Sequence, residues 1–179
     1  MMRKTVLILL ALTMGVMVFT SVAQAQYGYN EVKMNNWEAH AGVGWFSGDT
    51  KNSTTWIAGV GYEYPTDKSL MGMNAITLGV DYYPVETLAD ETASVVPMLI
   101  GYRKYVPMGN NKWYFGAGLG GRWVSRDIPE LKMDKGLIFG WDLNAGIYFN
   151  PTFFGQTRYI AGSHPADDGL FTLELGYKF

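Results

Sequence analysis

The chain has 179 residues, no cysteine, and 14 basic against 16 acidic side chains. The lack of cysteine excludes disulfide bonds and thiolate metal sites, and the charge balance leaves no broad basic field for nucleic acid. Aromatic residues make up 15% of the chain and 22 residues are glycine, both high shares for one domain's worth of sequence.

The first residues have the pattern of a secretory signal peptide. Arg3 and Lys4 precede an apolar run from Val6 to Phe19, and a small-x-small motif ends at Ala25. The alternative is an uncleaved membrane anchor, but the run is short for a spanning helix and leads directly into the cleavage motif. We therefore predict cleavage after Ala25.

We predict three parts in the chain: a cleaved signal peptide (1–25), a polar periplasmic lead-in (26–36) and one domain (37–179). Removing Arg3 and Lys4 takes the formal net charge from −2 to −4. The domain contains no apolar run long enough for a transmembrane helix.

From Trp37 onward, apolar residues recur at every second position, which predicts β-strands with one apolar and one polar face. Pro97 cannot donate to a strand ladder, so we expect a bulge there or a position near the rim. Eight strands of about ten residues suit a tilted crossing of a bilayer. The predicted strands are Trp37–Phe46, Thr54–Tyr64, Asn74–Tyr83, Ser94–Val106, Trp113–Ser125, Gly136–Phe149, Thr152–Ala161 and Leu170–Phe179.

The connections alternate in character. Those after the second, fourth and sixth predicted strands hold Pro, Gly and Asn, whereas the others hold most of the loop carboxylates. An even strand number returns the end of the chain to the side where the first strand begins. We therefore predict a closed, all-β, antiparallel up-and-down barrel with short periplasmic turns and acidic extracellular loops.

Charged residues within the strands avoid the apolar face. Only Lys104 shares the apolar phase, and it lies near a strand end where a long side chain can reach water. Nine residues share the opposite phase: Glu38, Glu63, Asp81, Arg103, Arg122, Asp142, Arg158, Glu174 and Lys178.

This phase decides between a membrane barrel and a soluble one. In a soluble barrel the apolar face would fill the interior, and an eight-stranded lumen cannot hold so many aromatic rings. On the outside of a membrane barrel the same rings form two girdles at the bilayer interfaces. The outer girdle is predicted from Trp45, Trp56, Tyr82 and Trp123, and the inner one from Tyr62, Tyr64, Tyr102, Trp113, Phe149, Tyr177 and Phe179.

The charged face then becomes a polar interior. Because an unpaired buried charge is costly, we expect Arg103, Arg122 and Arg158 each to pair with a strand carboxylate. Inward glycines such as Gly140 leave room for these long side chains. The network can serve as a plug or as an ion pathway, and the narrow lumen of eight strands favours the plug.

The C-terminal strand carries a resemblance to a known family. Its large apolar residues alternate with polar ones: Phe171, Leu173, Leu175, Tyr177 and Phe179. This pattern resembles the C-terminal signal strand of bacterial outer-membrane β-barrel proteins, and the chain is similar to the OmpA/OmpX-like, porin-like superfamily. The resemblance implies outer-membrane localisation and recognition by the barrel assembly machinery and periplasmic chaperones. Outer-membrane lipid and lipopolysaccharide would surround the barrel.

Some small outer-membrane barrels are enzymes that edit lipopolysaccharide. The deacylase family, similar in size and strand number, uses a His-x-Ser motif with a downstream Glu. Here His40 is followed two residues later by Gly42, and His164 by Ala166, so the motif is missing. The palmitoyltransferase family carries an N-terminal amphipathic helix, which the short polar lead-in does not match.

Ser163, His164 and Asp167 gather in the last loop, and their turn-rich surroundings favour a solvated loop over a triad. We predict no catalytic residue, no cofactor and no metal site. Two functions remain open. One is a non-enzymatic barrel in envelope integrity, surface contact or small-solute passage; the other is a lipid A deacylase-like enzyme with an unrecognised site.

Overall fold

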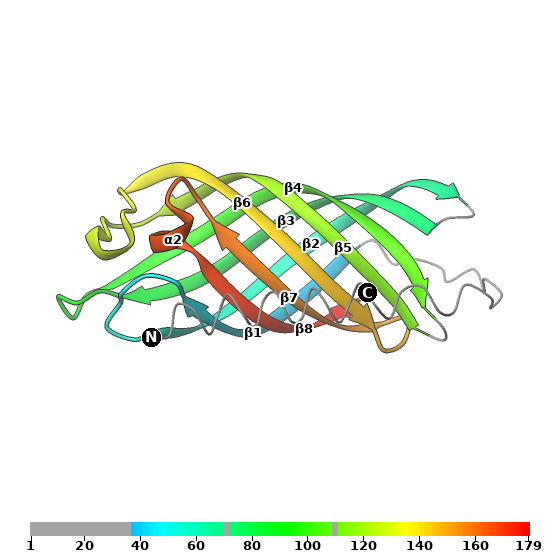
Figure 1. Ribbon diagram of the computed structural model, residues 1–179, viewed down its shortest axis with the longest axis horizontal. Coiled ribbons are helices and arrows are strands. Elements are labelled where there is room, and N and C mark those ends of the chain that lie inside the picture. The colour runs from blue at the N-terminus through cyan, green and yellow to red at the C-terminus, as the bar shows by residue number, and fades with distance from the viewer. Residues whose placement is uncertain (1–36, 70–71, 109–110) are drawn as a thin grey trace.

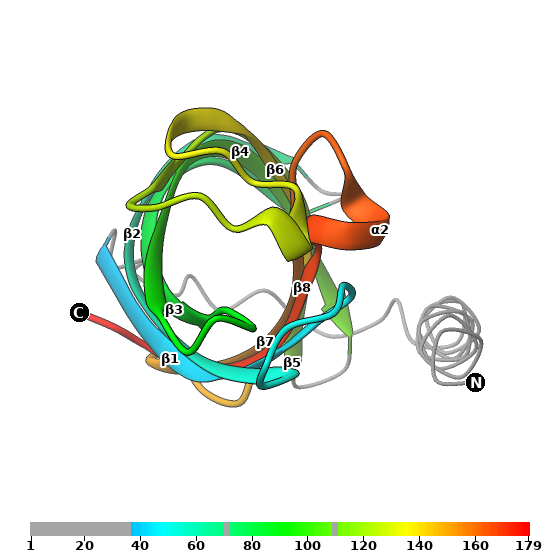
Figure 2. The ribbon, with the colours of Figure 1, turned by 90° about the vertical axis from the view of Figure 1, so that its left-hand side faces the viewer.

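The computed structural model describes residues 37–69, 72–108 and 111–179. Eight strands close into one antiparallel barrel in which each strand pairs with its sequence neighbours and β1 pairs with β8. Figures 1 and 2 show the tilted strands from the side and end-on. The strands are β1 (Trp37–Phe46), β2 (Thr54–Ser69), β3 (Gly72–Glu86), β4 (Thr92–Met108), β5 (Asn111–Val124), β6 (Gly136–Tyr148), β7 (Phe153–Ala161) and β8 (Leu170–Lys178).

The predicted fold class is confirmed. A 3₁₀ turn, η1 (Pro129–Leu131), and one helical turn, α2 (Pro165–Asp168), are the only helical elements in the described residues. No helix in that part of the chain has the length and apolar character needed to span a membrane. The predicted signal peptide and lead-in lie outside the described residues.

The connections fall into two sets at opposite ends of the barrel. Ser69 pairs with Gly72 and Met108 pairs with Asn111, so two hairpins are tight at what we call the turn end. The four longer connections, which we call the first to fourth loops, lie at the loop end. They comprise residues 47–53, 87–91, 125–135 and 162–169.

Strands β2 and β3 extend toward the turn end beyond the predicted limits of Tyr64 and Asn74. The ladder continues beyond Pro65, which pairs with Ala75, through a register shift between Pro65 and Asp67. The shift leaves Thr66 unpaired directly after the proline, as a β-bulge does. Strands β4 and β5 also extend farther toward the turn end than predicted, and Figure 1 shows both hairpins projecting beyond the other strands.

The bulge expected at Pro97 is absent. Pro97 stands opposite Arg122 in an unshifted β4–β5 register. Toward β3 the register is the same on both sides of the proline, at Val80–Met98 and at Tyr83–Val95. Pairing between β3 and β4 is missing only between these two pairs. The strand therefore accommodates the proline by losing local pairing on one side, with no extra residue.

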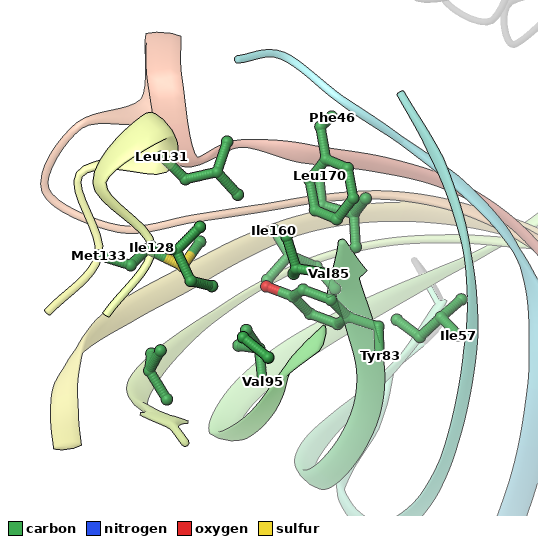
Figure 3. Packing of buried hydrophobic residues seen from close by; sticks show 12 residues of the cluster. Phe46, Ile57, Tyr83, Val85, Val95, Ile128, Leu131, Met133, Ile160 and Leu170 are labelled. Carbon is green, nitrogen blue, oxygen red and sulfur yellow. The ribbon is translucent and has the colours of Figure 1, made fainter. Parts of the chain in front are cut away.

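Side chains fill the barrel in three layers. Near the loop end lies an apolar layer of 12 buried residues, several of which Figure 3 labels. The middle holds the charged residues, and near the turn end Tyr105, Tyr114, Tyr148, Phe154 and Ala75 form an aromatic layer. The apolar layer consists of Phe46, Ile57, Tyr83, Val85, Ala93, Val95, Val124, Ile128, Leu131, Met133, Ile160 and Leu170.

The outer surface carries large apolar residues from all eight strands. The rings predicted for the outer girdle, Trp45, Trp56, Tyr82 and Trp123, are all exposed there. Trp141 belongs to the apolar phase of the predicted strand Gly136–Phe149, which predicts an outward ring. In the structure it is half-buried: its indole N–H donates to the Gly162 carbonyl (2.9 Å) and its ring packs on Tyr159.

Candidate functional site

The first cluster of interior charges is centred on Arg103 of β4. Its two terminal nitrogens donate to both oxygens of Glu38 at 2.9 and 3.0 Å, a bidentate arrangement that fixes the guanidinium plane. Glu63 accepts from Arg103, from Lys178 and from the Tyr105 hydroxyl. Three strands that are distant in sequence thus share one buried carboxylate.

The second cluster is centred on Arg158 of β7. Its terminal nitrogens donate to the two oxygens of Asp81 at 3.0 and 2.9 Å, and its Nε donates to Asp142 at 3.1 Å. Glu174 lies 3.8 Å from the same guanidinium. Each charge in this cluster has an opposite partner, as burial in a low-dielectric interior requires.

Arg122 belongs to neither cluster, which corrects the expectation that it pairs with a strand carboxylate. Fully buried beside the apolar layer, it donates to the side chain and the carbonyl of Asp168 in α2. Asp168 in turn accepts from the Gly162 N–H at 3.0 Å. The pair fastens the fourth loop to the barrel wall, and a Cβ built on Gly140 would lie 2.7 Å from the Arg122 side chain.

Several inward-facing polar residues belong to this network, although the sequence analysis predicted it from charged residues alone. His40 Nε2 lies 2.6 Å from Asp81, and Gln156 donates to Glu174 at 2.7 Å. The hydroxyls of Tyr105 and Tyr114 bond to Glu63 and Gln156. Their inward phase was the available signal, but uncharged side chains on a polar face do not stand out from the sequence.

A cavity of about 30 Å³ lies in the middle layer, between the two charge clusters. Glu38 and Arg103 of the first cluster and Asp81 and Arg158 of the second line it. The volume admits a few water molecules and no larger solute. In the described residues no group of three or more His, Cys, Asp or Glu side chains could hold a metal ion.

The four loops are joined into a closed arrangement that we call the loop ring. Each loop is linked to the loops on either side of it. Between the first and second loops, the hydrogen bond and the charge of Asp90 raise the pKa of Lys51. Arg126 also pairs with Glu91 between the second and third loops. The other links are Lys51–Asp90 (2.5 Å), Leu88 N to Glu130 Oε1 (3.0 Å), Lys132–Asp167 (2.8 Å) and Ser47 N to Gly169 O (2.8 Å).

The third loop also closes the barrel mouth from within the ring. Ile128 and Met133 bridge each other, and with Leu131 they pack into the apolar layer (Figure 3). Arg126 and Lys132, on the rim, remain exposed. The loop is therefore an amphipathic cap.

The last loop shows no triad geometry. Ser163 and His164 are exposed, and the His164 side chain makes no capping bond to α2. Asp167 pairs with Lys132 of the third loop. The nucleophile–base–carboxylate chain that hydrolysis requires does not form among these residues.

The C-terminal strand presents its alternate large residues to the outside. Leu173, Leu175, Tyr177 and Phe179 are exposed, Phe171 is partly exposed, and Tyr177 and Phe179 stack at 6.2 Å. The Phe179 N–H donates to the Trp37 carbonyl, next to the β1–β8 seam. Recognition of this strand by an assembly machinery stays a prediction.

A closed eight-stranded barrel with an apolar belt and a charged, filled interior defines the fold of small outer-membrane β-barrel proteins. No family model matches the chain, and no curated protein sequence matches it. The similarity of the chain to known proteins therefore comes from the comparison with solved structures.

The chain is similar in structure to the outer membrane enzyme PagL, with a TM-score of 0.62 and 17% identity over 79% of this chain and 98% of the other. It is also similar to Yersinia pestis Ail in a nanodisc, with a TM-score of 0.50 and 11% identity over 81% and 99%. The N-terminal barrel domain of Pseudomonas aeruginosa OprF gives 0.49 and 15% over 82% and 98%. At these identities the likeness to PagL and to Ail shows the fold alone.

Proposed function

We propose that the protein is a non-enzymatic, non-conducting barrel of the bacterial outer membrane that acts at the cell surface, in contact or in envelope integrity. The observation that carries the proposal is the filling of the interior by an apolar layer, two charge clusters and an aromatic layer. Because the lumen is filled in this way, we expect the outer surface and the loops to make the functional contacts.

The loop ring supports the surface role. Its inter-loop links hold four loops in one arrangement before any partner arrives, and preorganisation lowers the entropic cost of binding. The greater length of the four loops supports an extracellular position for them, because outer-membrane barrels have short periplasmic turns and longer extracellular loops. Lipid and lipopolysaccharide would contact the apolar belt and its exposed tryptophans.

The test uses cells that lack the protein and are complemented with wild type or with a variant carrying Lys51→Ala, Arg126→Ala and Lys132→Ala. This variant removes the three ion pairs of the loop ring, keeps its Leu88–Glu130 and Ser47–Gly169 hydrogen bonds, and leaves the interior unchanged. We expect normal membrane levels with loss of surface adherence or of detergent resistance, whichever the deletion affects. If the deletion changes neither property, the proposed function is wrong.

The likeness to PagL favours one alternative, a lipopolysaccharide-modifying enzyme. The purified barrel would be incubated with lipopolysaccharide and the lipid products weighed by mass spectrometry. Our proposal expects unchanged lipid mass. A loss or gain of one acyl chain would establish the alternative, and its abolition by His164→Ala or His40→Ala would locate the site.

A further inference from the structure

The short helix α2 lies between the barrel wall and the neighbouring loops, and Figure 2 shows it just outside the ring of strands. Two adjacent carboxylates of α2 turn in opposite directions. Asp167 pairs with Lys132 of the third loop at 2.8 Å, and both side chains are accessible to solvent. Asp168 is 2% exposed and pairs with the fully buried Arg122 of β5. One face of α2 is therefore tied to the surface and the other to the barrel interior.

The first loop is attached to the same helix. The Ser47 hydroxyl lies within hydrogen-bond distance of the carbonyl oxygens of Pro165 (3.1 Å) and Gly169 (3.0 Å), and the Ser47 N–H donates to Gly169 at 2.8 Å. The Tyr159 hydroxyl of β7 donates to the same Pro165 carbonyl at 2.5 Å. A Cβ built on Gly48 would lie directly against the α2 backbone, so the two loops are in contact. The position of α2 thus fixes the position of the first loop.

Gly162 leaves the space in which the buried ion pair forms. A Cβ built there would lie 2.6 Å from the Asp168 carboxylate, 2.8 Å from the backbone oxygen of Phe139 and directly against the Arg122 guanidinium. The Gly162 N–H donates to Asp168 at 3.0 Å, and the Gly162 carbonyl accepts from the Trp141 indole at 2.9 Å. The start of the fourth loop is therefore fixed to the same ion pair as its end.

The buried pair differs in energy from the exposed link on the other face of α2. An exposed ion pair such as Lys132–Asp167 shifts an equilibrium by less than about fivefold. Removing one member of a buried ion pair leaves an uncompensated charge in the interior and shifts the equilibrium by about a hundredfold or more. Arg122 can lose its partner only if α2 moves away and admits water. We therefore expect two discrete positions of α2, closed and open.

We infer that the Arg122–Asp168 ion pair is a latch that holds the first and fourth loops closed, and that these two loops open together when it breaks. The third loop stays in the barrel mouth during this opening, because Ile128, Leu131 and Met133 pack into the apolar layer. A partner that binds one of the two loops only in its closed position also orders the other. The latch does not depend on the proposed surface function.

Hydrogen exchange of the refolded wild-type barrel tests the inference without a variant. One opening exposes the amides of Ser47, Gly162 and Asp168 together, so their protection factors should agree within about threefold. The Met133 amide, which donates to Ile128 within the third loop at 3.1 Å, should be better protected than these three. A larger difference between Ser47 and Gly162 would overturn the inference.

Two matched variants separate the latch from the exposed link. Asp168→Asn removes the charge that pairs with Arg122, and Asp167→Asn removes the adjacent charge on the other face of α2. We expect exchange at Ser47 to become about a hundredfold faster in Asp168→Asn and less than about fivefold faster in Asp167→Asn, with Met133 unchanged in both. Equal effects of the two variants, or an equal effect at Met133, would overturn the inference. Failure of Asp168→Asn to fold would also contradict it, because an open latch leaves the barrel intact.

Discussion

Inward-facing strand positions hold apolar side chains at the loop end of this barrel and charged side chains in its middle. At the loop end, 12 buried residues form an apolar layer, and the buried Arg122–Asp168 ion pair lies beside it. In the middle, Arg103 and Arg158 hold four carboxylates by direct contacts of 3.1 Å or less.

The difference follows from what covers each layer. The third loop brings Ile128, Leu131 and Met133 over the mouth, so inward positions there can be apolar and dry. The middle has only opposite strands as neighbours, and long charged side chains span the lumen where glycines make room. The first layer contributes burial, and the second fixes which strands face each other.

Breaking the middle should have the largest effect. Arg158→Met removes the counter-charge of Asp81, Asp142 and Glu174 together, and we expect a loss of about 3–5 kcal/mol in the free energy of unfolding. Urea titration followed by heat-modified gel mobility measures the loss. Lys104→Met, on the outer face, is the control and should have little effect; equal losses would refute the paired interior.

Breaking the loop end should cost somewhat less. Leu131→Ala leaves a cavity under the third loop, which can partly collapse, and we expect a loss of about 2–3 kcal/mol. Leu137→Ala removes an exposed leucine and serves as the control. Should both variants unfold at the same urea concentration, the third loop does not pack as a cap.

The loop ring should contribute little to stability. Lys132→Ala breaks an exposed ion pair with Asp167, and such pairs contribute about 0.2–1 kcal/mol. We expect an unfolding midpoint near that of the wild type and a difference that shrinks further in high salt. A loss comparable to that of Leu131→Ala would mean that the ring is a structural core.

Deleting Phe179 should have the smallest effect on the folded barrel. Its ring is exposed and shares the turn end with Tyr177 and Phe153. We expect normal refolding in detergent and reduced levels in the outer membrane of cells. Unchanged membrane levels with impaired refolding would show that the residue is structural and that the signal-strand interpretation is wrong.

The sequence predicted the features that depend on local periodicity. Alternation placed eight strands and assigned Glu38, Asp81 and Arg158 to the interior before any contact was known. The apolar layer was missed, although the inward phase of Tyr83 continues through Val85. The ends of β2, β3 and β4 were set too early because the proline after each predicted end was interpreted as the start of a turn or loop.

Other features could not be predicted because they depend on contacts across the barrel. The partner of Arg122 lies in a loop 46 residues away, and nothing in its strand points to Asp168. The cavity depends on the volumes of side chains from β1, β4 and β6 meeting in space. A period-two pattern predicts whether a side chain faces inward or outward, but not which side chain it meets across the lumen.

The central claim is that the interior is filled, and single-channel recording in planar bilayers tests it most directly. The refolded wild type, with its folded fraction verified by gel mobility, should give no steady conductance. Lys104→Met should be equally silent, since it changes only the outer face. Steady, uniform current steps from the wild-type monomer would contradict the account.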